Sequence, residues 1–402
     1  MNQGAGKKIM QNQNKVNQVS NSQNTGAQGI EGQSAGNAAI QTRRGSEPLL
    51  RIVKRSELTG RQIILLRLLA VLLALAAGGL FILCLGYNPF TVYATILSGA
   101  MRSPMAIQAT VKIVVPLLIA SLGVTLAFKM RFWNIGAEGQ MIMGAIFASY
   151  FALFHAGWNH WVLLAVMALA GVLGGALWGL IPAFFKAKYG TNETLFTLML
   201  NYIALYLVSW LQDGPWRDPG SQGFGKIARF DKNAALNKVF GVHFGWIVAL
   251  VLVAVVFIYL RYTKQGYEIS VVGESQETAR YAGMNVRKIL LRTMALSGGV
   301  CGLGGMLQAA GADITLTMGV AGGVGFTAII VAWLSQLNPM TILVVSALFG
   351  ILEKGSSVVQ SNFGLSTDCA DVLQGIILFF ILGCEFFIRY RFVGRGQKDR
   401  GE

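Results

Sequence analysis

A short polar segment, NIGAEGQ at residues 134–140, stands between two long apolar stretches. Near a membrane core its carboxylate and two amides cost free energy unless they are partnered, roughly 2.5–3.5 kcal/mol for an acid at the centre of a membrane helix. Membrane proteins keep such groups where they face a water-filled cavity or another helix. Asn134, Glu138 and Gln140 therefore indicate a polar pathway for a solute.

Further polar residues stand near the ends of other apolar stretches and are candidates for the same pathway: Asn192, Glu193, Asn201, Gln308 and Asp313. Each also has a structural interpretation. Thr191 could cap a helix with Glu193 in its first turn, where an acid complements the helix dipole. Glu138 could brace a neighbouring loop. The sequence leaves both interpretations open.

The sequence gives little support for a metal site, a nucleotide-binding loop or a catalytic site. The four cysteines are scattered without metal-ligand spacing, and His155 and His160 fit the aromatic belt of a membrane interface. Residues 220–227 imitate a phosphate-binding loop, but Ile227 stands where a hydroxyl residue must hold Mg²⁺. We therefore expect no metal, no cofactor and no catalytic site.

The elements that must position these residues are membrane helices. The chain is 54% hydrophobic and 13% charged, with a mean hydropathy of +0.54, outside the range of ordinary soluble domains. Apolar runs long enough to cross a ~30 Å hydrocarbon core recur along it. They predict an all-α polytopic fold with about ten spans, near 63–86, 106–128, 136–154, 161–185, 194–211, 244–262, 293–311, 322–337, 339–356 and 371–390.

The basic residues predict the orientation of these spans. Most lysines and arginines fall in segments that are cytoplasmic if both termini lie inside, as the positive-inside rule requires. The net charge of +15 mostly reflects this bias and does not indicate nucleic-acid binding. Residues 1–45 are polar and predict a disordered cytoplasmic tail, 46–392 form the transmembrane domain, and 393–402 are a second cytoplasmic tail.

Glycine patterns predict how the helices pack. Gly171, Gly175 and Gly179 repeat every four residues, which favours close approach of two helices. A second cluster, between Gly319 and Gly325, is typical of a broken or re-entrant segment that lines a cavity.

The longest internal connection that we expect to be cytoplasmic covers about 263–292. Its sequence predicts a short polar helix. Ser275 can cap its start, Glu277 stands in its first turn, and Gly283 can end it. We expect non-helical connections on both sides. Residues 276–281 are too polar to lie comfortably in a lipid interface, so a protein partner fits better.

Three motifs carry a resemblance to a known family. Residues 277–283 resemble the Glu-x-Ala-x-x-x-Gly coupling loop of ABC importer permeases, where a short helix docks into the ATP-binding subunit. Residues 132–140 and 190–204 are similar to the "FNIGAEGQ" and "NE…TLMLNYIA" segments of one subfamily. The likeness runs from about residue 50 to the C-terminus. The family is the branched-chain amino acid, ribose and xylose permeases, and the motifs are closest to its nucleoside or simple-sugar permeases.

The resemblance implies a permease subunit in a bacterial cell membrane that hydrolyses no ATP itself. Its partners would be separate ATPases, a second and different permease subunit, a substrate-binding lipoprotein and the bilayer. The residues implied in coupling to the ATPase are Glu274, Ser275, Gln276, Glu277, Ala279, Arg280 and Gly283.

Two alternatives stay open. An ion-coupled secondary transporter could also have ten spans, with an ion site at Glu138 and Asp313, but it would not need the polar helix. A branched-chain amino acid or a pentose could replace the nucleoside as solute. Lys129 and Arg131 place residues 132–140 at the cytoplasmic start of a span, which favours an inner gate or a brace.

Overall fold

The computed structural model describes residues 50–54, 60–364 and 368–394, which fall into two units. In the smaller unit, β1 (Leu50–Lys54) pairs antiparallel with β4 (Tyr390–Gly394). The larger unit runs from Glu57 to Arg389 and holds the helices. The predicted tail at 1–45 lies outside the described residues, as do residues 395–402.

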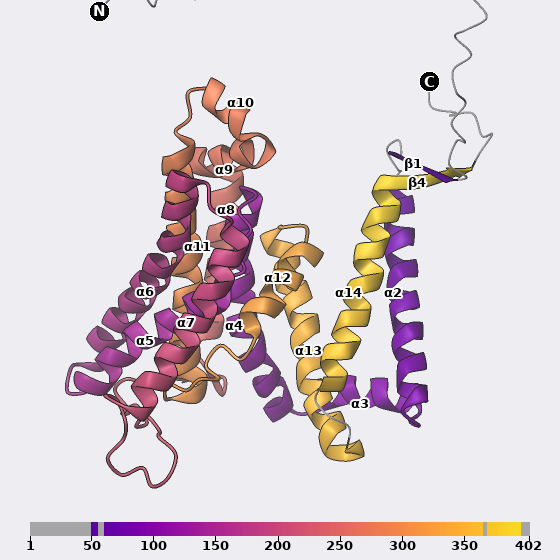
Figure 1. Cartoon of the computed structure of the whole chain (residues 1–402). Coiled ribbons are helices and arrows are strands. Elements are labelled where there is room, and N and C mark those ends of the chain that lie inside the picture. The colour runs from indigo at the N-terminus through magenta and orange to yellow at the C-terminus, as the bar shows by residue number, and fades with distance from the viewer. Residues whose placement is uncertain (1–49, 55–59, 365–367, 395–402) are drawn as a thin grey trace, which may run out of the picture. The chain divides into compact units, whose positions relative to one another are not determined.

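The regular secondary structure of the larger unit is helical apart from one short hairpin, β2 (Lys238–Val239) with β3 (Val242–His243), which confirms the predicted all-α class. Its helices (Figure 1) are α2 (Gly60–Cys84), α3 (Pro89–Met101), α4 (Pro104–Lys129), α5 (Ala137–Phe154), α6 (His160–Tyr189), α7 (Glu193–Asp213), α8 (Gly245–Tyr262), α9 (Lys264–Glu274), α10 (Gln276–Tyr281), α11 (Val286–Leu307), a π-helical segment η1 (Gln308–Asp313), α12 (Val324–Leu334), α13 (Pro339–Phe363) and α14 (Asp368–Arg389).

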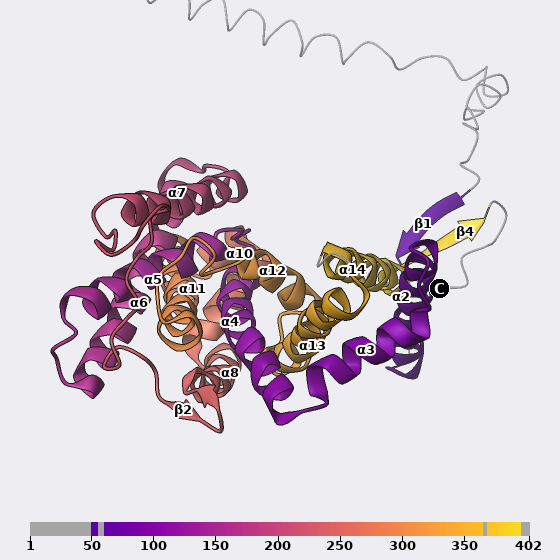
Figure 2. The same cartoon turned by 90° about the horizontal axis from the view of Figure 1, so that it is seen from below.

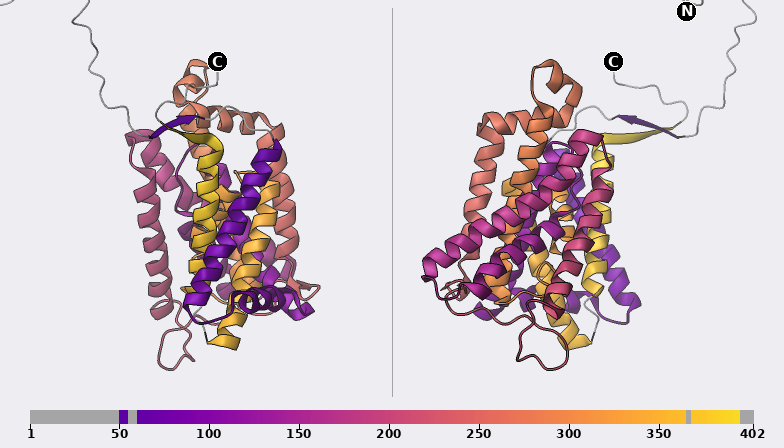
Figure 3. Two further views of the ribbon diagram at one scale, coloured as in Figure 1. Left: turned by 90° about the vertical axis from the view of Figure 1, so that its right-hand side faces the viewer. Right: turned by 60° about the vertical axis from the view of Figure 1, so that its left-hand side comes forward.

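The described residues hold fewer membrane-length helices than the ten spans predicted. Among the described residues, seven helices are long and apolar enough to cross a membrane, or eight if one bent pair counts as a span. The bent pair includes α3, which the sequence prediction missed. It follows α2 after a bend of 110° and lies across the end of α2 in Figure 3.

The predicted span at 322–337 is wrong as a complete membrane helix. Only α12 forms there, and its 11 residues extend about 16 Å at 1.5 Å per residue, roughly half of a ~30 Å core. The residues between η1 and α12 are not helical, and Gly322 and Gly323 have φ values of 55° and 83°, which favour glycine. The backbone is therefore broken at the glycine cluster as predicted, and that the segment lines a cavity stays a prediction.

The centre of the larger unit is α11, which packs against α4, α5 and α6 (Figure 2). Glycine permits this packing. A Cβ atom on Gly175 of α6 would collide with the carbonyl oxygen of Gly298 on α11, and one on Gly302 would collide with that of Gly171. The close approach predicted from the glycine repeat is confirmed, and its partner is α11.

We expect Gly175→Ala to lower the free energy of unfolding by about 1–3 kcal/mol, because the added methyl group must push α6 and α11 apart. Thermal unfolding of the purified protein measures the change. Gly375→Ala is the matched control, since its Cβ would have no atom within 4 Å. Equal stability of the two variants would contradict the close approach.

Candidate functional site

Residues 134–140 form the centre of a buried hydrogen-bond network. The side-chain amides of Asn134 and Gln140 pair in both directions, each with an N···O distance of 3.2 Å. The Asn134 amide also donates to Ser297 Oγ of α11 at 3.4 Å, and Ser297 donates to the Gly123 carbonyl of α4 at 2.7 Å. Asn134 and Gln140 are almost completely buried. The pair therefore ties the start of α5 to α4 and α11.

A second set of bonds joins this segment to α7. Asn201 accepts from the Gly139 N–H at 2.9 Å and donates to the Ile135 carbonyl at 2.9 Å. One turn earlier, Thr197 Oγ1 accepts from the Ile135 N–H at 3.2 Å. The two segments that carry the subfamily resemblance thus bind each other directly. Asn134 and Gln140 from one predicted segment and Asn201 from another come together here.

Glu138 holds the start of α12. Its Oε1 accepts from the Gly323 N–H at 2.8 Å, and its Oε2 accepts from the Gly325 N–H at 2.7 Å. These N–H groups belong to the first turn of a helix, where they lack helical partners and where the dipole favours a negative charge. Glu138 is 9% exposed, and neither of the two salt bridges among the described residues, Lys186–Glu193 and Arg292–Glu268, includes it. This geometry matches the bracing interpretation of Glu138.

Aromatic rings hold the other end of α12. Trp333, in its last turn, stacks on Trp133 with ring centroids 5.6 Å apart and an interplanar angle of 25°. Phe128 lies within 5.7 Å of both rings. Since Glu138 meets the first turn and Trp133 the last, residues 133–138 run beside the whole length of α12. No sequence pattern pairs Trp133 with Trp333, and only the structure brings them together.

Asn192 and Glu193 lie at the turn between α6 and α7. Asn192, not Thr191 as predicted, caps α7, because its Oδ1 accepts from the N–H groups of Thr194 and Leu195. Glu193 stands in the first turn as predicted, and its carboxylate lies 2.7 Å from Lys186 Nζ.

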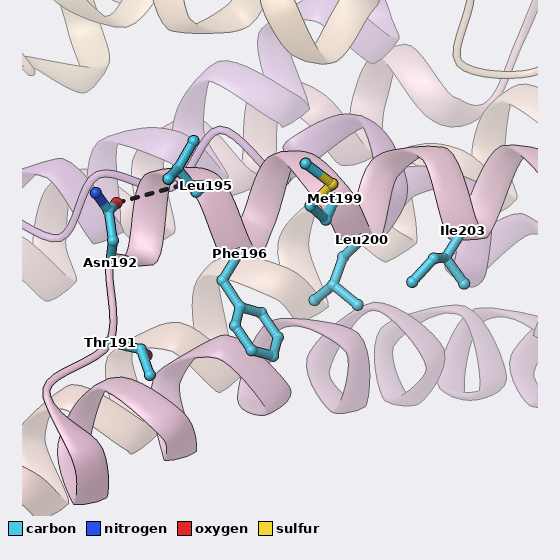
Figure 4. Close-up of a pocket in the computed structure, with 7 residues that line it drawn as sticks. All are labelled: Thr191, Asn192, Leu195, Phe196, Met199, Leu200 and Ile203. Atoms are coloured by element: carbon cyan, nitrogen blue, oxygen red, sulfur yellow. Dashed lines mark hydrogen bonds between the residues drawn. The ribbon is translucent and has the colours of Figure 1, made fainter.

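A hollow of about 450 Å³ runs along α7 from Thr191 and Asn192 (Figure 4). The rest of its lining is apolar: Leu195, Phe196, Met199, Leu200 and Ile203. Such a surface suits hydrocarbon or another helix and gives a polar solute few partners.

Gln308 and Asp313 form a separate polar group. The Gln308 amide donates to Asp313 at 3.1 Å inside η1, and π-helical segments often mark functional sites. Gln308 lies 11 residues beyond Ser297, about 16 Å along the helix. Beside η1 packs His243, which the sequence analysis missed. Burial and the nearby Lys112 lower the pKa of His243 to about 4.

The polar helix predicted in the long connection is α10, at the far tip of the larger unit in Figure 1. Ser275 Oγ accepts from the Thr278 N–H at 3.2 Å, and Gly283, with φ 77°, follows the end of the helix, both as predicted. Ala279 is buried, whereas Gln276, Glu277 and Arg280 are exposed and Tyr281 is 93% exposed. The predicted non-helical connection before α10 is wrong, because α9 ends at Glu274, directly before the cap.

Comparison with known proteins identifies the family. Residues 105–382 match the family described as the permease component of the branched-chain amino acid transport system. The chain is 33% identical over 346 residues to the glucose ABC transporter permease protein TsgB13 of Haloferax volcanii, with 83% of this chain and 90% of the relative covered. Two guanosine ABC transporter permease proteins of Bacillus subtilis are also similar: NupP, 29% identical with 79% and 92% covered, and NupQ, 27% identical with 66% and 86% covered.

The fold and these relatives define a multi-pass membrane subunit of an ABC transporter, a transport component and not an enzyme. The chain belongs to the branched-chain amino acid transport system permease family. The family resemblance seen in the sequence is therefore confirmed. Membership implies ATPase and substrate-binding partners.

We expect Glu138→Gln to lower the free energy of unfolding by about 1.5–3 kcal/mol. The amide keeps the size of the side chain, but it loses the charge and turns an NH₂ group towards an N–H donor of α12. Thermal unfolding of the purified chain provides the measurement.

Glu277→Gln is the matched control. It also removes one carboxylate from the first turn of a helix, but Glu277 is exposed, so its loss should cost about 0–0.5 kcal/mol. A loss for Glu138→Gln no larger than that of the control would show that the carboxylate does not hold α12.

Proposed function

We propose that this chain forms half of the translocation pathway of an ABC importer for a nucleoside or a related simple sugar, in a bacterial cell membrane. A substrate-binding lipoprotein would deliver the solute, and separate ATPases would drive its passage. The observation that carries this proposal is α10, an exposed polar helix joined rigidly to the membrane helices. An ion-coupled transporter would have no need of it.

Through α9, a force on α10 would be transmitted to the membrane helices. Only the cap residue Ser275 separates it from α9, and α11 begins shortly after Gly283. Gly273 of α9 packs against the carbonyl group of Lys129 at the end of α4. The carboxylate of Glu268 on α9 lies 3.0 Å from the Arg292 guanidinium of α11. A push on α10 by closing ATPases would therefore reach α4 and α11 together.

The proposed pathway passes beside the broken segment and α12. Non-helical backbone at membrane depth is tolerated where it is buried in protein or lines a water-filled cavity. Residues 314–323 are not helical and would be such a segment. Asn134, Glu138, Gln140 and Asn201 would shape this pathway by holding α12, because their polar groups are already engaged. Gln308 and Asp313 would lie nearer its outer end.

We propose a different, related chain as the second permease subunit. NupP and NupQ, two distinct permease proteins of one organism, both resemble this chain. α7 offers a surface for the contact. It exposes Leu195, Met199, Tyr202 and Tyr206 at helical spacing.

For the coupling helix, we expect Arg280→Ala with Tyr281→Ala to reduce the ATPase that co-purifies with the complex by at least about tenfold, since exposed Tyr and Arg side chains dominate many docking energies. Quantitative pull-down from detergent measures this loss. Phe240→Ala, also strongly exposed but in the loop between α7 and α8, is the control. Undiminished ATPase binding, or sodium- or proton-driven uptake by this chain alone, would contradict the proposal.

For the solute, we expect the cognate binding lipoprotein to be stabilised by guanosine or other nucleosides in a thermal-shift panel that also contains glucose, a pentose and leucine. The binding protein selects the solute, so this panel tests identity without depending on pathway residues. Uptake of the best ligand by the reconstituted importer should require ATP. Stabilisation by leucine alone would replace the nucleoside with a branched-chain amino acid.

A further inference from the structure

We propose that a pocket at the α10-bearing end of the helices binds the phosphate of an anionic phospholipid. This headgroup pocket has a volume of about 480 Å³. It is lined by Lys129 at the end of α4, Arg261 at the end of α8, Tyr267 of α9, and Asn338 and Pro339 where α13 begins. Four helices thus meet around one hollow.

The headgroup pocket carries positive charge that the protein does not neutralise. Lys129 is half-buried, and neither it nor Arg261 has a carboxylate partner among the described residues. The Arg261 guanidinium lies over the ring of Phe257, 5.9 Å from its centroid. A basic residue in the last turn also offsets a helix dipole. That effect explains one cation at each helix end, but it does not explain a hollow that both cations line.

Polar donors complete the site. Asn338 caps α13 through its Oδ1, which accepts from the Met340 N–H at 3.1 Å. This bond leaves the side-chain NH₂ of Asn338 as a donor. Tyr267 adds a phenolic hydroxyl on a side chain that is 63% exposed. Ammonium, guanidinium, amide and phenol groups all donate hydrogen bonds, which matches the acceptor oxygens of a phosphate.

Apolar surface next to the pocket favours a lipid over a free phosphate ion. α8 exposes Val251, Val255 and Ile258 at helical spacing before it reaches Arg261. α13 exposes Val344 and Leu348 in the turns that follow Pro339. Both helices are long and apolar enough to span a membrane, so their ends lie near the lipid headgroups. Basic pockets between membrane helices are known sites for anionic headgroups.

A lipid in the headgroup pocket would connect α9 with the start of α13. Tyr267 belongs to α9, which carries α10, whereas Asn338 follows α12 and begins α13. A bound phosphate would bridge these elements across the end of α4. Anionic lipid would therefore link α9 to the turn between α12 and α13.

The test compares the full chain in nanodiscs of phosphatidylcholine with nanodiscs that also contain phosphatidylglycerol. We expect phosphatidylglycerol to raise the unfolding temperature and to remain bound after extraction into detergent, as measured by mass spectrometry of retained lipid. Lys129→Gln with Arg261→Gln should reduce retention at least about tenfold, since each basic side chain near a membrane surface contributes about fivefold.

Arg131→Gln is the control for general attraction, because Arg131 is an exposed cation two residues from Lys129 that does not line the pocket. It should behave as the unmodified chain does. Arg261→Gln alone, at an exposed position, keeps the test valid if the double variant unfolds. Equal retention in the pocket and control variants would overturn the proposal. Equal stabilisation by inorganic phosphate in phosphatidylcholine would also overturn it, because the ligand would then be a free anion. Neither readout involves the ATPases or the transported solute.

Discussion

The Glu138 carboxylate and the first-turn N–H groups of α12 each supply the hydrogen-bond partner that the other lacks. A buried carboxylate without a partner is costly, and so is a helix start whose N–H groups have no acceptor. The two bonds from Gly323 and Gly325, at 2.8 and 2.7 Å, remove both costs together. Because of this pairing, α12 can begin inside the protein, and the chain can cross part of the structure as an unwound segment.

This pairing constrains the rest of the packing. Glu138 is placed correctly only if the start of α5 is fixed, and the amide pair of Asn134 and Gln140 fixes it against α4 and α11. Asn201 secures the same backbone from α7. The glycines shared by α6 and α11 then bring these helices close together. Polar residues in this fold therefore act mainly on backbone groups, and small residues set the distances between helices.

The sequence predicted local features well and long-range partners poorly. Ser275 and Gly283 mark the ends of α10 because helix caps depend on neighbouring residues only. The length of α12 was not predictable, since the apolar run at 322–337 looks the same whether it spans a membrane or stops halfway. α3 was missed because hydropathy does not report a 110° bend. The partner of Glu138 lies 185 residues away, and no single sequence reveals such a contact.

The nature of the bonds to α12 has a consequence for the transport pathway. Glu138 binds backbone N–H groups, so its hold on the start of α12 does not depend on which side chains that helix carries. Gly325 is the exception, because a Cβ atom there would collide with the backbone of Glu138. A permease that receives a solute already selected by a binding protein needs a pathway surface that is fixed in position but binds the solute weakly. A helix held by its backbone at one end and by stacked tryptophans at the other would meet that requirement if it lines the pathway as proposed, because these contacts leave the rest of the helix to face the solute.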